Sequence, residues 1–120
     1  MRKLVGLLIF ALTAFASLGA WAEKSKVTGW VSDENCGVTH TKPGREDCVT
    51  KCRRGGASIG HPEWKPQRMV LVVEPENDLL FVDNPEALSG QDGKHVQVSG
   101  DVDAKKKSIH VENFSAIPSD

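Results

Sequence analysis

The chain has 120 residues, 39% of them hydrophobic, and a formal net charge of −1 at neutral pH. This length and composition support one domain with a modest core and exclude a second domain. A nearly neutral charge balance without a basic stripe argues against a nucleic-acid partner, because contacts to phosphates need clustered lysine and arginine.

The first 22 residues have the pattern of a secretory signal peptide. Arg2 and Lys3 give a positive start, residues 4–18 form an almost unbroken apolar run, and Ala20-Trp21-Ala22 places small residues where signal peptidase cuts. The apolar run is shorter than the roughly 20 residues of a membrane-spanning helix, which favours a cleaved leader over an anchor. We expect export to a periplasm or beyond the cell, cleavage after Ala22, and no stable membrane insertion afterwards.

Residues 23–120 are then expected to form the single working domain. Cleavage would remove two bases and none of the sixteen acids, which leaves thirteen bases and a net charge of −3. The mature surface is therefore predicted to be mildly acidic. Export also permits disulfides, which matters for a chain with three cysteines.

A first strand and a long insertion are predicted next along the chain. Lys26 to Ser32 has strand composition, and Gly29 within it marks a bend or a close approach of two backbones. Residues 33–67 are rich in glycine, proline and charge, and such a long segment is rarely an idle connection. Within the insertion, Glu46 to Arg54 predicts a short helix, because acids open it, bases close it and Gly55-Gly56 follow.

Two hairpins with a short helix between them are predicted after the insertion. Residues 68–74 and 79–82 are apolar runs of strand length, separated by a polar turn. Asn84-Pro85-Glu86 predicts the start of the helix, with Asn84 as its cap. Apolar and polar residues alternate over 96–99 and again over 109–112, which predicts the last two strands.

This order of elements predicts a mainly β fold, a five-stranded OB-like barrel with a short helix between strands three and four. A plain five-stranded sheet or a partly open barrel is the competing architecture. In the barrel interpretation, the Cys-rich insertion occupies the loop between strands one and two. OB folds commonly bind ligands with that loop.

All three cysteines lie in the insertion together with one histidine. Cys36 and His40, then Cys48 and Cys52, form two pairs with a four-residue step. On a helix, Cys48 and Cys52 would have β-carbons about 5–6 Å apart, whereas a disulfide needs about 3.8 Å, so these two should not bridge each other. Thiolate and imidazole are ligands that zinc and copper(I) accept. The first hypothesis is therefore a Cys3His site for zinc or copper.

Two alternatives to a metal site stay open at this point. Cys36 could form a disulfide with Cys48 or Cys52, which would give a stapled OB-fold module with a structural or ligand-binding role and one free thiol. Cys48, near the start of a predicted helix with bases around it, could instead be the reactive thiolate of a redox or exchange protein. The sequence contains no C-x-x-C motif to support this second alternative.

Three further histidines have simpler interpretations. His61, beside Glu63 and Trp64, could be a substitute or fifth ligand, but ordinary loop chemistry explains it as well. We expect Trp64 to fold over the barrel as a cover for the core. His95 and His110 fall on the polar sides of their strands, so both are expected to face solvent.

No pattern of an established catalytic site occurs in the sequence. G-x-S-x-G, H-E-x-x-H, a phosphate-binding glycine loop and C-x-x-C-H are all missing. Acidic pairs such as Asp33-Glu34 stand where capping or solvation accounts for them. We therefore expect a binding module, whose partner is a metal ion or small ligand, more than an enzyme. The sequence does not identify a protein partner.

Three stretches of the mature chain resemble a group of small exported bacterial proteins with a GWxSDxxCGxxH…DCxxxC motif. They are Thr28 to His40 (TGWVSDENCGVTH), Asp47 to Cys52 (DCVTKC) and residues 55–57. Residues 93–100 and 107–111 are similar to the last two strands of bacterial OB-fold proteins. The resemblance implies export and the Cys/His cluster, and it implies no particular substrate, cofactor or reaction.

Overall fold

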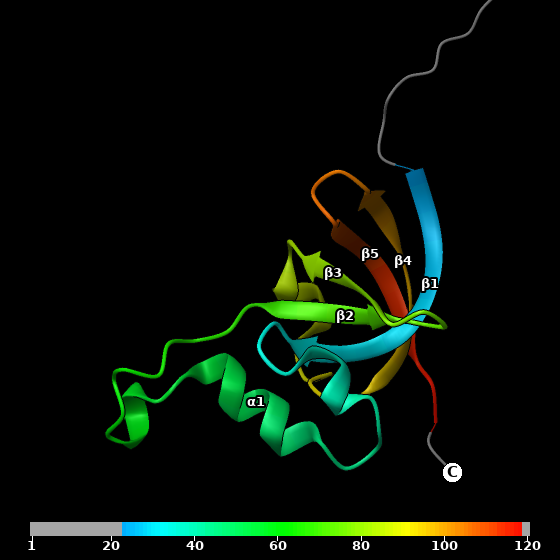
Figure 1. The fold of residues 1–120 in the computed structure, drawn as a ribbon. Helices are drawn as coiled ribbons and strands as arrows, with labels where there is room; N and C mark the ends of the chain where they lie inside the picture. Colours follow the sequence, from blue (N-terminus) through cyan, green and yellow to red (C-terminus); the bar gives the residue numbers. More distant parts are fainter. Residues whose placement is uncertain (1–22, 119–120) are drawn as a thin grey trace, which may run out of the picture.

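The computed structural model describes residues 23–118, in which five strands form one sheet (Figure 1). Their pairings run β1-β2-β3-β5-β4 and return from β4 to β1, so the sheet closes into a barrel. Neighbouring strands are antiparallel except β3 and β5, which are parallel. The strands are β1 (Glu23–Asp33), β2 (Met69–Val73), β3 (Asp78–Val82), β4 (His95–Asp103) and β5 (Ser108–Ala116). The predicted signal peptide, residues 1–22, lies outside the described residues.

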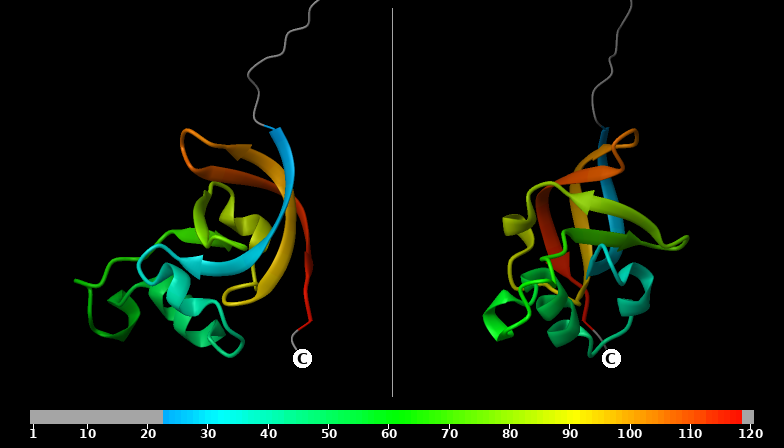
Figure 2. Two further views of the ribbon diagram at one scale, coloured as in Figure 1. Left: turned by 45° about the vertical axis from the view of Figure 1, so that its right-hand side comes forward. Right: turned by 60° about the vertical axis from the view of Figure 1, so that its left-hand side comes forward.

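The long first strand β1 belongs to two parts of the sheet. Residues 23–30 pair with β4, and residues 29–33 pair with β2, so the strand curves around the barrel (Figure 2). Gly29 lies where the two ladders overlap. A β-carbon there would overlap the carbonyl oxygen of Val72. The close backbone approach predicted at Gly29 is therefore confirmed.

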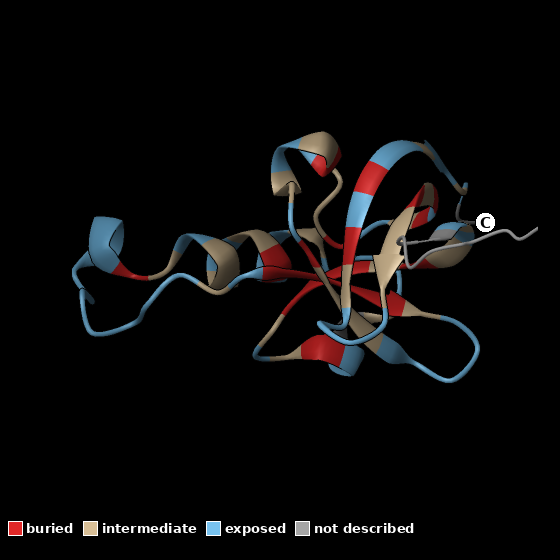
Figure 3. Cartoon of the chain, turned by 90° about the horizontal axis from the view of Figure 1, so that it is seen from above, coloured by how far each residue is buried: buried red, intermediate tan, exposed pale blue. Residues whose placement is uncertain are grey.

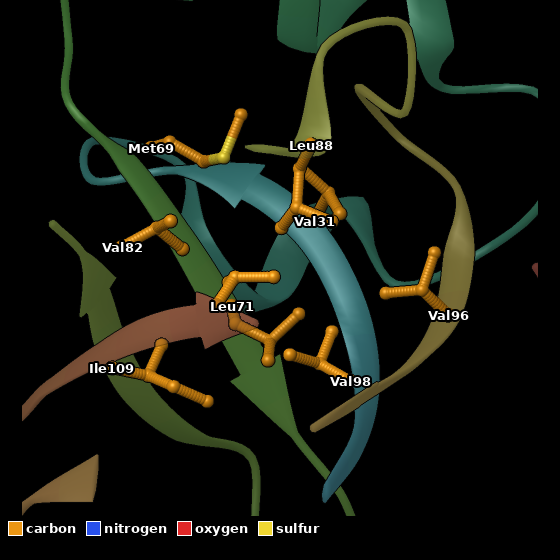
Figure 4. Close-up of a cluster of buried hydrophobic side chains, with 9 residues drawn as sticks. Val31, Met69, Leu71, Val82, Leu88, Val96, Val98 and Ile109 are labelled. Atoms are coloured by element: carbon orange, nitrogen blue, oxygen red, sulfur yellow. The ribbon is translucent and has the colours of Figure 1, made fainter. Parts of the chain in front are cut away.

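The barrel interior is filled by aliphatic side chains from every strand and from one turn of helix. Alternate residues of β4 and β5 point inward, as the predicted alternation requires, and β2 is buried over most of its length. Figure 4 shows these side chains converging on one centre. The buried cluster consists of Val31, Met69, Leu71, Val82, Leu88, Val96, Val98, Ile109 and Val111.

The predicted helix between β3 and β4 is present as a single 3-10 turn, η3 (Pro85–Leu88). Leu88 from this turn is fully buried and belongs to the same core cluster as Val31 (Figure 4). Asn84 does not cap the helix as predicted. Instead its side-chain amide donates to the carbonyl of Val111 at 2.8 Å and accepts from the Val111 N–H at 2.8 Å, which ties η3 to β5.

The insertion between β1 and β2 contains three short helices and extends away from the barrel (Figures 1 and 3). The α-helix α1 (Glu46–Arg54) has the predicted bounds and ends at Gly55, which has a positive φ of 77°. The other two, η1 (Gly37–His40) and η2 (Ala57–Ile59), are 3-10 turns. Within residues 23–118, no helix has the length and apolarity needed to cross a bilayer.

Helix α1 is fastened to the segment that leads into β4. The carboxylate of Asp92 accepts hydrogen bonds from Thr50 Oγ1 at 3.0 Å and from Arg53 Nη1 at 2.7 Å. Next to it, a β-carbon at Gly93 would lie 2.6 Å from Cα of Glu46, so only glycine lets the helix start pass so close. These contacts fix the position of α1 against the barrel.

Candidate metal centre

The end of β1 forms a buried polar turn that places Cys36. Asp33 is fully buried, and its Oδ1 accepts the backbone N–H groups of Asn35 at 3.0 Å and Cys36 at 2.8 Å. Ser32, also buried, donates its hydroxyl to the carbonyl of Gly37 at 2.8 Å. A carboxylate that bonds to the backbone two and three residues ahead folds the chain back on itself. The Cys36 side chain is thereby held beside Asp33.

The third member of the cluster comes from α1. Cys52 is half-buried in the last turn of the helix, and its carbonyl accepts the N–H of Gln67 at 3.1 Å. One ligand atom from each of Asp33, Cys36 and Cys52 lies within 4.8 Å of the other two. Two thiols and a carboxylate from separate elements therefore converge at the junction of barrel and insertion.

The surroundings of Cys52 disfavour negative charge. Burial, the largest cause, acts together with the negative charges of Asp33, Cys36 and Cys48 and a hydrogen bond to Cys36 to raise the pKa of the Cys52 thiol to about 12. Cys52 is therefore a neutral thiol at pH 7 when no cation is near. A cation at this point would relieve the same repulsion and favour the thiolate.

The predicted ligands separate into two groups. Cys36 and Cys52 are brought together. Cys48 has an exposed side chain and is not part of the group of three, although its charge acts on Cys52. His40 closes η1, but its side chain lies outside the described part of the chain. All three cysteines are free thiols.

Asp33 is the residue of the cluster that sequence reasoning missed. We expected capping or solvation for the Asp33-Glu34 pair, and Asp33 indeed holds the turn. The available signal was its place close after Trp30-Val31, at the end of the predicted first strand and three residues before a cysteine.

Trp64 is not the cover of the core that we predicted. Its side chain is 52% exposed and stacks on the ring of His61, with ring centroids 3.8 Å apart. The backbone explains this position, because the N–H of Gly56 donates to the carbonyl of Trp64 at 2.8 Å and holds the loop against the end of α1. His61 pairs with Glu63 through Nδ1 at 3.0 Å and does not reach the thiols in the group of three.

The two histidines of β4 and β5 differ from each other. His110 is exposed, as predicted, and its Nδ1 lies 2.7 Å from Asp83. His95 does not simply face solvent, since its ring stacks on Trp30 at 4.5 Å and its Nε2 lies 2.7 Å from Glu74. A polar side chain on an outer sheet face can thus be half-buried by an aromatic neighbour.

Two thiols with a carboxylate are a donor set suited to a borderline-soft cation such as zinc. The same two thiols lie near enough to each other for a disulfide to be an alternative to a shared metal ion. No family model, curated protein or solved structure matches this chain.

Proposed function

We propose that this protein is a small exported binding module that holds a transition metal ion at the junction of β1 and α1. The observation that supports it is the convergence of Asp33, Cys36 and Cys52 within 4.8 Å. Zinc accepts thiolate, carboxylate and imidazole ligands, whereas copper(I) prefers soft donors alone. The buried carboxylate therefore favours zinc over copper.

A closed zinc site has four protein ligands, and two further residues are candidates for the fourth position. His40 ends the 3-10 turn that begins directly after Cys36. Cys48 stands one helical turn before Cys52 on α1, with an exposed side chain. We propose His40 for the fourth position, since it completes the Cys/His pattern of the sequence, and keep Cys48 as the alternative.

The proposed scaffold is an OB-type barrel. The strand order, the parallel pair β3 and β5, and the 3-10 turn that plugs the core between β3 and β4 are the features that support it. The metal site then occupies the loop between the first two strands, where OB folds commonly bind ligands. Export rests on the leader pattern of residues 1–22. The proposed role is binding, without catalysis.

A disulfide between Cys36 and Cys52 is the second candidate, and the proximity of their sulfur atoms favours it over a bridge to Cys48. Such a bridge would staple α1 to the end of β1 and leave Cys48 as a free thiol. A redox role through Cys48, which is exposed, is the third candidate. The raised pKa of Cys52 makes that thiol a poor nucleophile at neutral pH.

The test is metal content and thiol count on the processed protein, purified anaerobically from an export host. We expect one zinc ion per chain and three thiols that react after chelation. Cys36→Ser, Cys52→Ser and Asp33→Asn should each weaken zinc binding by at least roughly tenfold in competition with a chromophoric chelator, since even outer-sphere changes cost about that much.

A matched histidine pair and one cysteine variant complete this experiment. His40→Asn should weaken zinc binding as strongly as the three ligand variants, while His110→Asn on the barrel should not. Cys48→Ser should leave affinity nearly unchanged, and a large loss would move the fourth position to Cys48. If the protein contains one intramolecular disulfide and no bound metal, the metal proposal is wrong and the disulfide-bonded module takes its place.

A further inference from the structure

A groove of about 860 Å³ lies between the second half of α1 and the segment that leads from it to β2. This volume falls in the range of about 300–1,000 Å³ found for small-molecule sites. The groove is distinct from the candidate metal centre, although Cys52 borders both. Its lining includes Lys51, Arg54, Ile59, Glu63, Trp64 and Lys65.

The groove is held in shape by backbone hydrogen bonds around Gly56. Its N–H donates to the carbonyl of Trp64 and its carbonyl accepts the N–H of His61, both at 2.8 Å. A β-carbon at Gly56 would overlap the carbonyl oxygen of His61 and lie 2.8 Å from Cε3 of Trp64. The loop is thus locked to the end of α1, and a preformed groove binds a ligand without first having to order itself.

The apolar part of the groove is unusually open to solvent. Ile59 is 64% exposed and Trp64 is 52% exposed, and both line the groove. Within the part of the chain that the structure describes, Val38 is the only other large hydrophobic residue that is so exposed. The stacked ring of His61 covers one region of the indole. Exposed apolar side chains that line one groove are a common feature of ligand-binding surfaces.

Positive charge surrounds this apolar surface. Lys51, Arg54 and Lys65 are exposed and form no ion pair with any residue between 23 and 118. Glu63 is the single acid of the described lining, and it is paired with His61. The groove therefore has three positively charged side chains that are available to an anionic ligand.

We propose that this groove binds a small organic anion with a flat apolar body, such as an aromatic carboxylate. The body packs on Trp64 and Ile59, and the acid group lies among the cations of Lys51, Arg54 and Lys65. One continuous cavity of drug-like volume with an aromatic wall fits a compact ligand better than an extended acidic peptide. The proposal does not depend on the metal proposal, because none of these side chains is a proposed metal ligand.

The experiment compares 2-naphthoate with its neutral analogue 2-naphthalenemethanol, by titration calorimetry on the processed protein at low ionic strength with a chelator present. We expect naphthoate to bind at least about fivefold more tightly than the alcohol, because exposed charge pairs contribute up to about that factor each. The triple variant Lys51→Gln, Arg54→Gln, Lys65→Gln should lose about tenfold for naphthoate and less than about twofold for the alcohol.

Control variants separate the groove from general charge and folding effects. Lys26→Gln, Lys105→Gln and Lys106→Gln together change three exposed lysines of the barrel and should leave naphthoate binding unchanged. Trp64→Ala should weaken both ligands, with the barrel signals of the amide NMR spectrum retained. Equal affinity for naphthoate and the alcohol, or no loss in the triple variant, would overturn the proposal. Tighter binding of an acidic peptide without aromatic residues would replace the small anion by a protein partner.

Discussion

The barrel and the insertion of residues 34–68 are held together in different ways. The barrel has a continuous aliphatic core to which every strand contributes. The insertion has one buried aliphatic side chain on α1, Val49, and otherwise depends on backbone hydrogen bonds, close-packed glycines and the Asp92 contacts (Figure 3). A segment without a core of its own opens more readily than the domain that carries it. Both proposed binding sites lie in or beside this less stable part.

The largest expected effect is the loss of barrel stability when a core side chain is truncated. Leu71 is fully buried in the cluster at the centre of the barrel. Leu71→Ala should lower the free energy of unfolding by about 2–5 kcal/mol, measured by urea denaturation. Ile59→Ala in the insertion should stay within about 0.5 kcal/mol, because that side chain is mostly exposed. A comparable loss in the two variants would contradict the division into a stable barrel and a weakly held insertion.

Zinc should act mainly on the insertion. An ion bound by Asp33, Cys36 and Cys52 would tie α1 to the end of β1, so α1 amides should exchange more slowly with zinc present. At 100 times the dissociation constant, a ligand specific for the folded site stabilises it by about 2.7 kcal/mol. Hydrogen exchange followed residue by residue measures this directly. Protection spread evenly over β4 and β5, and absent from α1, would place the ion elsewhere.

Breaking the polar anchor of α1 should have a smaller and local effect. Asp92 bonds to both Thr50 and Arg53 and is partly buried, so Asp92→Ala should cost about 1–3 kcal/mol. The cost should appear as faster exchange of α1 amides and as weaker zinc binding, with the barrel intact. Asp78→Ala, at the exposed start of β3, serves as the control. Unchanged exchange in α1 would mean that other contacts hold the helix.

Removing a proton from Cys52 should be harder in the folded protein than in the unfolded chain. Burial and nearby negative charge raise its pKa from 9.0 to about 12. As pH rises above about 9, the unfolded chain loses this proton and the folded protein keeps it, so the metal-free protein loses stability. Urea denaturation at pH 8 and pH 10 should show this loss, and Cys52→Ser should reduce it while Cys48→Ser should not. Bound zinc should abolish it.

The regular elements could be predicted from local sequence signals. Alternation in β4 and β5 and the charged ends of α1 depend on near neighbours in the chain, and the bounds of α1 followed from them. The short helix after β3 was also predictable, but the role of Asn84 was not, because its partner Val111 stands 27 residues away. Capping preference describes a residue in its own turn and carries no information about a distant strand.

In the candidate site, too, local spacing could be predicted and contacts between distant residues could not. The four-residue step of Cys48 and Cys52 predicted a shared helix face, but the approach of Cys36 to Cys52 depends on contacts between distant residues, such as the one that fastens α1 to the segment before β4. Asp33 joins them because β1 ends in a buried turn. The position of Trp64 was predicted wrongly for the same reason, because a hydrogen bond from Gly56 determines where the Trp64 loop lies.

The smallest expected effect concerns the exposed ion pair that joins the two ends of the insertion. Glu34 accepts hydrogen bonds from the guanidinium of Arg68 at 3.0 Å and from the backbone N–H of Arg68 at 2.7 Å, and these bonds lower the pKa of Glu34 from 4.5. A carboxyl with a lowered pKa stabilises the fold above its usual titration range, and this contribution is lost as pH falls through the folded value.

Glu34→Gln should therefore cost less than about 1 kcal/mol at pH 7, because a pair open to solvent is well screened. The difference between the two proteins should shrink as pH falls below 4.5, where the parent chain also loses its charge at Glu34. Urea denaturation of both proteins between pH 7 and pH 3 measures that difference. Lys24 and Glu112 form a similarly exposed pair on the barrel, and Glu112→Gln is the matched control. If Glu34→Gln speeds the hydrogen exchange of α1 amides and Glu112→Gln does not, the insertion depends on its polar contacts even where each contact is weak.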